Sequence, residues 1–445
     1  MNAGENPLLA AFGFLSGRYA RLNRDIHPDD EMLIQYRNLR NQDVDAALVA
    51  YFDSGSRLWT AMAALLHWRF PDGPGPSFQL LDFASGFGRV TRFIVLDLPP
   101  ERIWVADIYA EGVRFQEEQL GVHGLVSHAD PERFQCGEAF DMVFVSSLFT
   151  HLPEETFRSW LRRLWSLVRP GGLLAFSVHD RDILPPGEGL PASGMLFHPH
   201  SESGSLPSEQ YGTTWVDEPF VRRLAGEVAQ GASVHRIPRG LVNFQDLYVV
   251  VPEADCDFSG LRWRAMPEVF VEHASAVGDQ LRLSGWVVDR VLRRQPRELR
   301  VRINGELRAS HHDFPVREEV GALFPYEQVT GYGWRLLSPL TPGDLEKNAS
   351  LEIEVVDADG SRAIPESGPL HDALLRSVRM DLYMTRLEMQ RLGAEAAEEK
   401  ARSERLRQEV QALETRLAGM RASRFWKLRN AWFRVKRAIG LTREE

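Results

Sequence analysis

One short stretch in the first half of the chain combines an acid with a loop of small residues. Residues 80–90 read Leu-Leu-Asp-Phe-Ala-Ser-Gly-Phe-Gly-Arg-Val, so an apolar run reaches Asp82 and a loop with Gly86 and Gly88 follows. This pattern is typical of a buried strand that turns into a helix N-terminus, where an open α/β sheet binds its ligand. Glycine lets the backbone turn sharply and come close to that ligand. An ordinary strand-to-helix turn is the other interpretation of the loop taken alone.

Two kinds of nucleotide ligand compete for this loop. A dinucleotide site uses the pattern G-x-G-x-x-G/A, and here Thr91 stands at its last position. Asp82 would repel a pyrophosphate, whereas it would attract a ligand with a cationic amino group. S-adenosylmethionine has such a group and a sulfonium as well. We therefore expect S-adenosylmethionine as the cofactor, while Thr91 disfavours a nicotinamide-dependent oxidoreductase.

Acids also follow the next two predicted strands. Asp107 stands at the end of the second strand, nineteen residues after Gly88, where a carboxylate can accept both hydroxyls of a ribose. Asp130 follows the third strand, within reach of an adenine amino group. A surface acid at a strand end is common, so Asp130 alone carries little. Three acids at three consecutive strand ends together favour an adenosine ligand.

Histidines at the same edge of the predicted sheet are the candidate catalytic residues. His151 follows the fourth strand and His179 the fifth. An oxygen acceptor benefits from a general base, so we expect His151 in that role and His179 as the second candidate. A hydrogen-bonded loop residue is the alternative for each. His198 and His200 lie in a loop, residues 185–204, that is rich in Gly, Pro and Ser, which predicts a mobile lid and no metal.

The elements that position these residues alternate regularly between strand and helix. Strands are predicted at 79–83, 102–106, 125–128, 140–146, 173–178, 234–237 and 247–251, and helices at 90–97, 111–120, 154–167 and 218–229. Such alternation implies βαβ units, so we predict an α/β fold with a doubly wound, mostly parallel seven-stranded sheet. Apolar residues at helical spacing before Pro71 make residues 1–78 cover helices, and residues 79–255 form the core.

Residues 25–252 resemble class I S-adenosylmethionine-dependent methyltransferases. Residues 81–89 are similar to the first motif of that family, residues 105–108 to its ribose-binding second motif, residues 140–143 to its fourth strand, and residues 169–172 to the turn before its fifth strand. Residues 146–152 and 211–214 resemble a bacterial branch that is linked with cell-surface glycan synthesis.

This resemblance implies a set of cofactor-binding residues. They are Asp82, Ala84, Ser85, Gly86, Gly88, Arg89, Asp107, Ile108, Asp130 and Ser146. Ala84 stands where the family usually has its first glycine. An alanine costs little there if its φ is negative, and roughly 1 kcal/mol or more if φ is positive.

After residue 255 the periodicity changes to two. Residues 281–288, 299–303 and 351–355 alternate, and the Asn304-Gly305 pair between two runs is a strong hairpin signal. Residues 256–368 are therefore predicted to form a small antiparallel β-sandwich. They resemble modules that accompany bacterial polysaccharide-synthesis enzymes. Trp286, Tyr332 and Trp334 are candidates to stack on a sugar ring, although such aromatics more often form the core.

The last segment, residues 369–445, is predicted to be a long helix. Apolar residues recur at 3–4 spacing from Leu375 to Met420, which indicates a coiled coil that forms a homo-oligomer or binds a partner protein. Residues 421–443 hold eight Lys or Arg, no acid and an apolar stripe. That pattern is typical of peripheral membrane contact, and packing on a partner helix is the alternative. Residues 423–429 also resemble terminal motifs of surface-glycan glycosyltransferases.

Composition narrows the class of protein. The formal net charge of −10 argues against a nucleic-acid partner. Cys136 and Cys256 are the only cysteines, which speaks against a disulfide framework and suits a reducing compartment. No run reaches the ~20 apolar residues of a membrane span. We expect a cytoplasmic protein, with peripheral contact at the inner face of the cell membrane through its tail.

These observations lead to two hypotheses of function. The first is O-methylation of a sugar hydroxyl in a cell-surface polysaccharide or its precursor, with S-adenosylmethionine as donor. The second is a catalytically weak scaffold of the methyltransferase fold that organises glycan enzymes through its β-domain and coiled coil.

Overall fold

The structure is a computed structural model. It describes Leu9, Phe14 and residues 17–439, apart from short gaps at 41, 186, 201–205, 262, 264–265, 292, 325–328, 346–348 and 361. Residues 1–380 form one compact unit and residues 381–445 a second.

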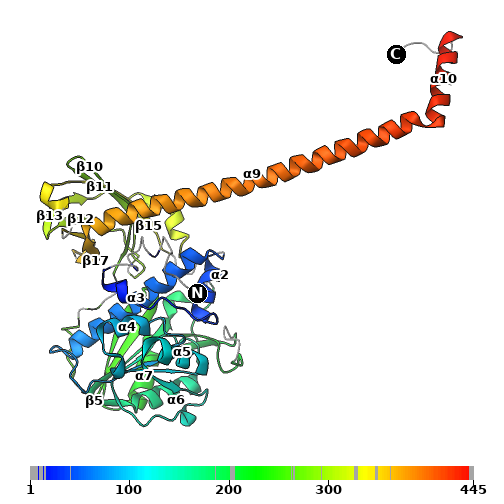
Figure 1. The fold of residues 1–445 in the computed structure, drawn as a ribbon. Coiled ribbons are helices and arrows are strands. Elements are labelled where there is room, and N and C mark those ends of the chain that lie inside the picture. The colour runs from blue at the N-terminus through cyan, green and yellow to red at the C-terminus, as the bar shows by residue number, and fades with distance from the viewer. Residues whose placement is uncertain are drawn as a thin grey trace. The chain divides into compact units, whose positions relative to one another are not determined.

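A mixed sheet forms the centre of the N-terminal part of the first unit (Figure 1). Its five parallel strands lie in the order β3-β2-β1-β4-β5, with bounds β1 Leu80–Phe83, β2 Ile103–Asp107, β3 His123–Val126, β4 Phe140–Val145 and β5 Val168–Asp180. β9 (Gln245–Val251) runs antiparallel to β5, and β8 (Ser233–Leu241) antiparallel to β9. These seven strands correspond to the seven that the sequence predicts.

Two short strands that the sequence analysis did not predict bring the sheet to nine. β7 (Thr213–Val216) pairs in parallel with the end of β5, and β6 (Met195–His198) pairs with β7. The prediction of seven strands was therefore wrong, because the sheet has these two strands in addition. β6 lies inside the Gly-, Pro- and Ser-rich segment that was predicted to be a lid, and each strand has only four residues. β7 depends for its pairing on the end of β5, and β6 depends on β7, so the local sequence marks neither as a strand.

Helices cover both faces of the sheet (Figure 1). α4 (Thr91–Asp97) contacts both α5 (Ala110–Leu120) and the N-terminal α3 (Val44–Arg69). α6 (Glu154–Trp165) packs with α7 (Glu218–Val228), and α2 (Glu31–Leu39) lies against α3. Single 3₁₀ turns occur at η1 Gly17–Arg21, η2 Pro100–Arg102, η3 Pro131–Arg133, η4 Arg181–Ile183 and η5 Pro342–Leu345. Apolar residues of the strands and of α6 and α7 form a continuous buried core.

Two predicted boundaries in the sheet need correction. The third strand starts at His123 and ends at Val126, so His128 follows the strand instead of ending it. β5 begins at Val168, so residues 169–172 lie in the strand instead of preceding it. Its register against β4 shifts there, which absorbs Gly171 at φ +77° as a bulge.

Residues 268–369 form two four-stranded antiparallel sheets. One has the order β10-β11-β15-β14 and the other β13-β12-β16-β17. Their bounds are β10 Glu268–Val277, β11 Gln280–Val288, β12 Glu298–Ile303, β13 Glu306–His311, β14 Val316–Arg317, β15 Gly331–Pro339, β16 Ser350–Val356 and β17 Arg362–Pro369, with the single turn α8 at Glu318–Gly321. Asn304 and Gly305 join β12 to β13 with φ values of +54° and +77°, as the hairpin signal predicts.

A second apolar core, which includes the buried Trp334, lies in this sandwich. Tyr332 packs against it while partly buried, and Trp286 stacks on Phe270 with ring centroids 5.4 Å apart. Trp334 therefore belongs to the core, the alternative that the sequence left open.

The C-terminal part is helical. α9 (Leu370–Ala422) is a single helix of 53 residues, and α10 (Arg424–Ala438) follows after Ser423 (Figure 1). Among the described residues, no helix combines the length and the apolar character that a membrane crossing requires.

Candidate functional site

A cavity of about 700 Å³ opens at the carboxyl ends of β1, β2 and β4. β1 lies between β2 and β4, so this is the position where the strand order reverses and where open α/β sheets bind ligands. Ten of the predicted site residues line it: Asp82, Ala84, Ser85, Gly86, Arg89, Asp107, Ile108, Asp130, Ser146 and His151. Gly88 and His179 do not line it.

The loop after β1 adopts left-handed backbone at three positions. Ala84, Gly86 and Gly88 have φ values of +59°, +59° and +82°. The question that the sequence left open at Ala84 is thus answered, because its φ is positive and an alanine there costs roughly 1 kcal/mol or more. Gly112 on α5 is a residue that sequence reasoning missed: a Cβ at this position would lie 2.5 Å from the carbonyl oxygen of Gly86.

Asp82 is a buried acid inside this loop, with an exposed fraction of 2%. Burial raises the pKa of its carboxyl to about 7, although the hydrogen bond from Thr91 and the charge of Arg89 lower it. Asp82 forms no ion pair with any described residue. A ligand cation beside it would therefore restore the ionised form.

Two polar side chains support the loop and were not identified from the sequence. The Thr91 hydroxyl lies 3.0 Å from Asp82 Oδ2 and 2.7 Å from Gln116 Oε1. The Gln116 amide donates to Ser85 Oγ and to the Gly86 carbonyl, each at 2.9 Å. Thr91, which breaks the dinucleotide pattern, thus has a positive role beside Asp82. Only the fold could show this, since Gln116 lies 25 residues further along the chain.

Asp107 ties the loop to the second strand. Its Oδ2 accepts from the Gly86 backbone N–H at 2.7 Å and its Oδ1 from that of Tyr109 at 2.9 Å. Burial raises the pKa of this carboxyl, and the two backbone hydrogen bonds act in the opposite direction. Each oxygen keeps a further lone pair that can accept from a ligand hydroxyl.

Asp130 and Arg89 occupy two other parts of the wall. Asp130 is exposed and its Oδ1 accepts from the Glu132 backbone N–H at 3.0 Å, which caps η3. The Arg89 guanidinium donates to Ser54 Oγ on α3 at 2.9 Å. The N-terminal cover helices therefore contact the loop after β1 directly.

His151 is held in one orientation by the residues before β7. Its Nδ1 lies 2.7 Å from the Gly212 carbonyl oxygen, and the Gly212 N–H donates to the His151 carbonyl at 2.8 Å. The ring also stacks on Tyr211, with centroids 4.6 Å apart. A carbonyl only accepts, so Nδ1 carries the proton and Nε2 is the proton acceptor of the neutral ring.

His179 lies behind this wall. Its ring centroid is 6.5 Å from that of His151, and burial lowers its pKa to about 3. Gln245 lies beside it and accepts from the Ser177 hydroxyl at 2.7 Å, and the same hydroxyl accepts from the backbone N–H of Ser147. Ser147 lines the cavity with φ +66°. A neutral, partly buried His179 that does not line the cavity fits a supporting role better than a direct one.

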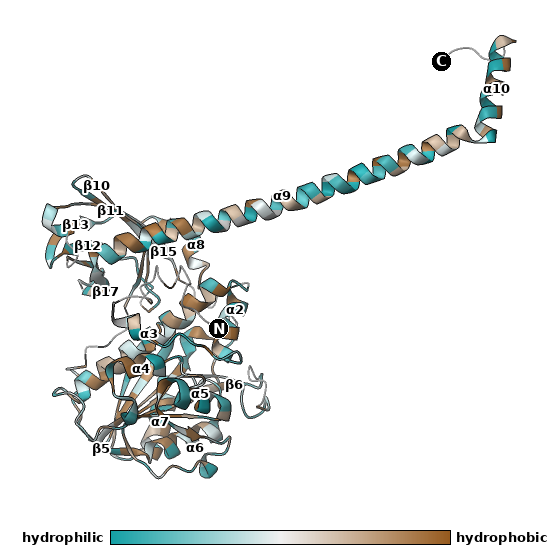
Figure 2. Ribbon diagram, in the orientation of Figure 1, coloured by the Kyte–Doolittle hydropathy of each residue, from teal (hydrophilic) through white to brown (hydrophobic). Residues whose placement is uncertain are grey.

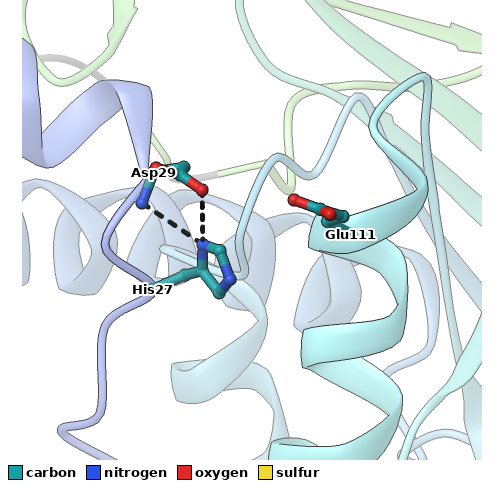
Figure 3. Close-up of side chains that lie close together, drawn as sticks. All are labelled: His27, Asp29 and Glu111. Carbon is teal, nitrogen blue, oxygen red and sulfur yellow. Dashed lines mark hydrogen bonds and ion pairs between the residues drawn. The ribbon is translucent and has the colours of Figure 1, made fainter.

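A cluster of His27, Asp29 and Glu111 is the one group among the described residues whose ligand atoms all lie within 4.8 Å (Figure 3). Asp29 and Glu111 are exposed, and His27 Nδ1 already accepts from the Asp29 N–H at 3.2 Å. The His27 ring stacks on Phe87 of the loop after β1, with ring centroids 4.8 Å apart. We assign the ring to that packing, and the absence of a metal stays a prediction. The segment of residues 185–204, which was predicted to be a lid, holds one acid close to a histidine: Glu188 Oε2 lies 3.0 Å from His198 Nε2.

Comparison with known proteins finds one family model that matches part of the chain. Residues 81–174 match the family model described as "Methyltransferase domain". No curated protein matches the sequence. Among solved structures, Streptomyces venezuelae DesVI is 15% identical over 51% of this chain and 99% of its own, with a TM-score of 0.36. The glycopeptide N-methyltransferase MtfA complexed with S-adenosylmethionine is 18% identical over 43% and 93%, with a TM-score of 0.31. A methyltransferase from Clostridium acetobutylicum is 12% identical over 49% and 97%, with a TM-score of 0.34.

The residues around the cavity fit S-adenosylmethionine. Asp82 is a buried carboxylate without an ion partner among the described residues, which suits the amino group of the methionine part. Asp107 offers carboxylate oxygens at the end of the adjacent strand, which suits ribose hydroxyls. Residues 81–174 therefore match a methyltransferase domain, and S-adenosylmethionine is the methyl donor that fits the cavity beside them.

Proposed function

We propose that this chain transfers a methyl group to the oxygen of a sugar hydroxyl in a cell-surface polysaccharide or its precursor. The observation that carries the proposal is the position of His151, a histidine with a fixed tautomer, in the wall of the cavity that also contains Asp82 and Asp107. A hydroxyl is a weak nucleophile until a base removes its proton, and His151 Nε2 is suited to accept it.

The chain's own residues account for orientation and for the proton. S-adenosylmethionine supplies an electrophilic methyl carbon attached to a sulfonium. Asp82 and Asp107 bind its two ends and so fix the direction from which the acceptor must approach. The Gly212 carbonyl keeps Nδ1 protonated, so the proton of the acceptor goes to Nε2. The stack on Tyr211 holds the ring plane during this step.

The polar character of the wall near His151 supports a hydroxylated acceptor. Ser147, Gln210 and Tyr211 line the cavity beside it. Their hydroxyl and amide groups can donate to and accept from sugar hydroxyls. The sequence similarity of residues 146–152 and 211–214 to a glycan-linked branch points to the same class of acceptor.

Two measurements test the proposal in order. Calorimetric titration should show micromolar binding of S-adenosylmethionine and no binding of NAD. A screen of sugar nucleotides and glycan fragments with a methyl-labelled donor should then identify an acceptor. Binding of NAD alone would overturn the site assignment, and donor binding without turnover on any glycan would favour the scaffold hypothesis.

The residue-level test is His151→Asn. We expect the methyl-transfer rate to fall by about 10²–10⁴-fold, because general-base catalysis contributes on that scale. The affinity for S-adenosylmethionine should stay within about twofold of wild type. The exposed His67 on α3 gives a matched control, since His67→Asn makes the same chemical change away from the cavity. Equal rates in the two variants would remove His151 from the mechanism.

A further inference from the structure

Helix α10 has a composition that the methyltransferase function does not use. It contains six Lys or Arg and no acid across Arg424–Ala438, although the whole chain carries a net charge of −10. All five residues of its apolar stripe are exposed: Phe425 78%, Leu428 70%, Trp432 58%, Val435 51% and Ile439 62%. No described residue covers this stripe.

The stripe is narrow and bordered by cations. Its members follow one another at spacings of three and four residues, which places them within roughly 80° of the helix circumference at 100° per residue. Arg424 lies next to one edge, and Arg429 and Lys436 next to the other. Lys436 Nζ lies 5.8 Å from the Trp432 ring centroid, and the Arg429 guanidinium 4.7 Å from that of Trp426. Figure 2 shows hydrophobic and hydrophilic residues mixed along this helix.

The stripe of α10 does not continue the stripe of α9. Positions of the α9 register reach Leu417 and Met420, so the next two positions would be Arg424 and Lys427, both cationic. The apolar residues of α10 instead begin one residue later, at Phe425. Ser423 makes this break, because its extended backbone ends α9 and its hydroxyl accepts from the Trp426 N–H at 3.2 Å. A coiled coil that holds α9 would therefore not bury the α10 stripe.

Two candidates remain to cover the α10 stripe, a partner helix outside the coiled coil and a lipid surface, and charge distinguishes them. A partner helix would need acids placed opposite the three cations that border the stripe, whereas an anionic lipid surface offers negative charge at every position. Arg424 and Lys427 also stand in the first turn, where the helix dipole disfavours cations and lipid phosphates would compensate for it. Tryptophan with flanking Lys and Arg is suited to the boundary between headgroups and acyl chains.

We propose that α10 binds an anionic lipid surface, with the stripe from Phe425 to Ile439 inserted among the acyl chains and the bordering cations Arg424, Arg429 and Lys436 at the phosphates. This property is independent of methyl transfer and goes beyond the function proposed above. It gives the enzyme a way to work on acceptors held at a membrane.

The test uses the full-length protein and flotation with vesicles. Vesicles of phosphatidylcholine alone and of phosphatidylcholine with phosphatidylglycerol separate lipid charge from lipid in general. We expect flotation only with the anionic vesicles and its loss as NaCl increases. Strong flotation with neutral vesicles, or none with anionic ones, would overturn the proposal.

Two substitutions with equal charge change test the stripe. Trp432→Glu lies within it, and Asn430→Glu lies on the opposite side of the same helix. Asn430→Glu should weaken binding by about fivefold, the effect of one charge near the surface. Trp432→Glu should weaken it by more than 50-fold, because it also removes a buried aromatic ring.

Equal effects of the two substitutions would contradict insertion of the stripe. Loss of self-association in Trp432→Glu without any flotation of wild type would show a protein partner instead, and would also overturn the proposal. Titration with S-adenosylmethionine should give wild-type affinity in both variants, so a failure here is distinguishable from a failure of the methyltransferase assignment.

Discussion

Ala84 is a residue whose backbone conformation opposes its side chain. Its φ of +59° costs an alanine roughly 1 kcal/mol or more, whereas glycine adopts it freely. Ala84→Gly removes this cost but gains about 0.4–1 kcal/mol of unfolded-state entropy. We therefore expect an unchanged or slightly higher free energy of unfolding, measured with urea, and unchanged affinity for S-adenosylmethionine.

The neighbouring Gly86 provides the converse substitution. It has the same φ of +59° and open space where a Cβ would stand. Gly86→Ala should therefore lower the free energy of unfolding by at most about 1 kcal/mol, because the loss of unfolded-state entropy partly offsets the strain. If Ala84→Gly destabilised the protein by that amount, the side chain of Ala84 would have a packing role that outweighs its strain.

Asp82 should make both stability and cofactor binding depend on pH. Burial raises its pKa to about 7, above the unfolded value of 3.8, so the folded state binds the proton more tightly. The protonated carboxyl stabilises the folded state fully below pH 4, and this stabilisation is lost as pH rises through 7. The resulting loss in the free energy of unfolding is roughly 4 kcal/mol at most. Asp82→Asn should therefore raise the free energy of unfolding of the ligand-free protein above pH 7.

The same carboxyl should release a proton when the cofactor binds. A ligand ammonium beside Asp82 lowers its pKa, so binding at pH 6.5 should release protons and become tighter as pH rises through 7. Calorimetry in buffers of different ionisation enthalpy measures this release, and Asp82→Asn should abolish it. Proton release that persists in the variant would place the cation elsewhere.

The site acids could be found from the sequence, while their partners could not. Asp82 and Asp107 were identified because strand ends in a parallel sheet converge on one edge. The φ of Ala84 depends on the turn that Asp107 and Gln116 impose through Gly86, and those contacts span 21 and 30 residues. His179 stood at the correct strand end, yet nothing local distinguishes a side chain in the wall from one behind it.

At the scale of elements, the regular alternation of strand and helix was predictable, whereas two strands that depend on distant pairing were not. The alternation of strands and helices gave the seven-stranded arrangement, and the Asn304-Gly305 pair gave a hairpin. β6 and β7 escaped because their hydrogen bonds depend on the end of β5, where His179 and Asp180 pair with β7. Tyr211 and Gly212 stand directly before β7 and contact His151. The missed strand pair therefore also positions the proposed base.

Strand β10 is linked to the methyltransferase core through Glu268. Its Oε1 lies 3.3 Å from Arg57 Nη1 on α3 and 2.8 Å from Arg290 Nη1, and it accepts from Asn243 at 3.0 Å. Burial alone would raise the pKa of Glu268, but the two guanidinium groups outweigh it and hold the pKa at about 2. The stabilisation is present above pH 4.5 and is lost as pH falls toward 2.

Glu268→Gln should therefore destabilise the protein by about 3 kcal/mol at pH 7, because it leaves two arginines beside a neutral group. Urea unfolding followed by circular dichroism measures this loss. Glu319→Gln is the matched control, since Glu319 pairs with Arg317 at 2.7 Å but is exposed, and its loss of stability should be much smaller. A loss in Glu268→Gln that does not shrink below pH 4 would show that charge is not the cause.

At the scale of the whole molecule, α9 presents an exposed apolar stripe whose heptad spacing suits a second helix. Exposed apolar residues recur in the heptad register at Val378, Leu382, Met389, Leu392, Leu406, Val410, Leu413, Leu417 and Met420. Glu399 and Ser403 occupy two central positions of this register and weaken it there. At 53 residues α9 is far longer than the ~12–15 residues below which an isolated helix is marginal, so the exposed apolar stripe, and not helix propensity, is what calls for a partner.

We expect a second copy of the chain to supply that packing, and light scattering after size exclusion should show an oligomer. Leu413→Glu places a charge in the stripe and should yield monomers, whereas Gln411→Glu on the outer side of the same turn should not. Pairing would also give each assembly two copies of α10, and two linked surfaces bind vesicles more tightly than one. Leu413→Glu should therefore weaken flotation without touching α10, and equal flotation of monomer and oligomer would show that each tail binds alone.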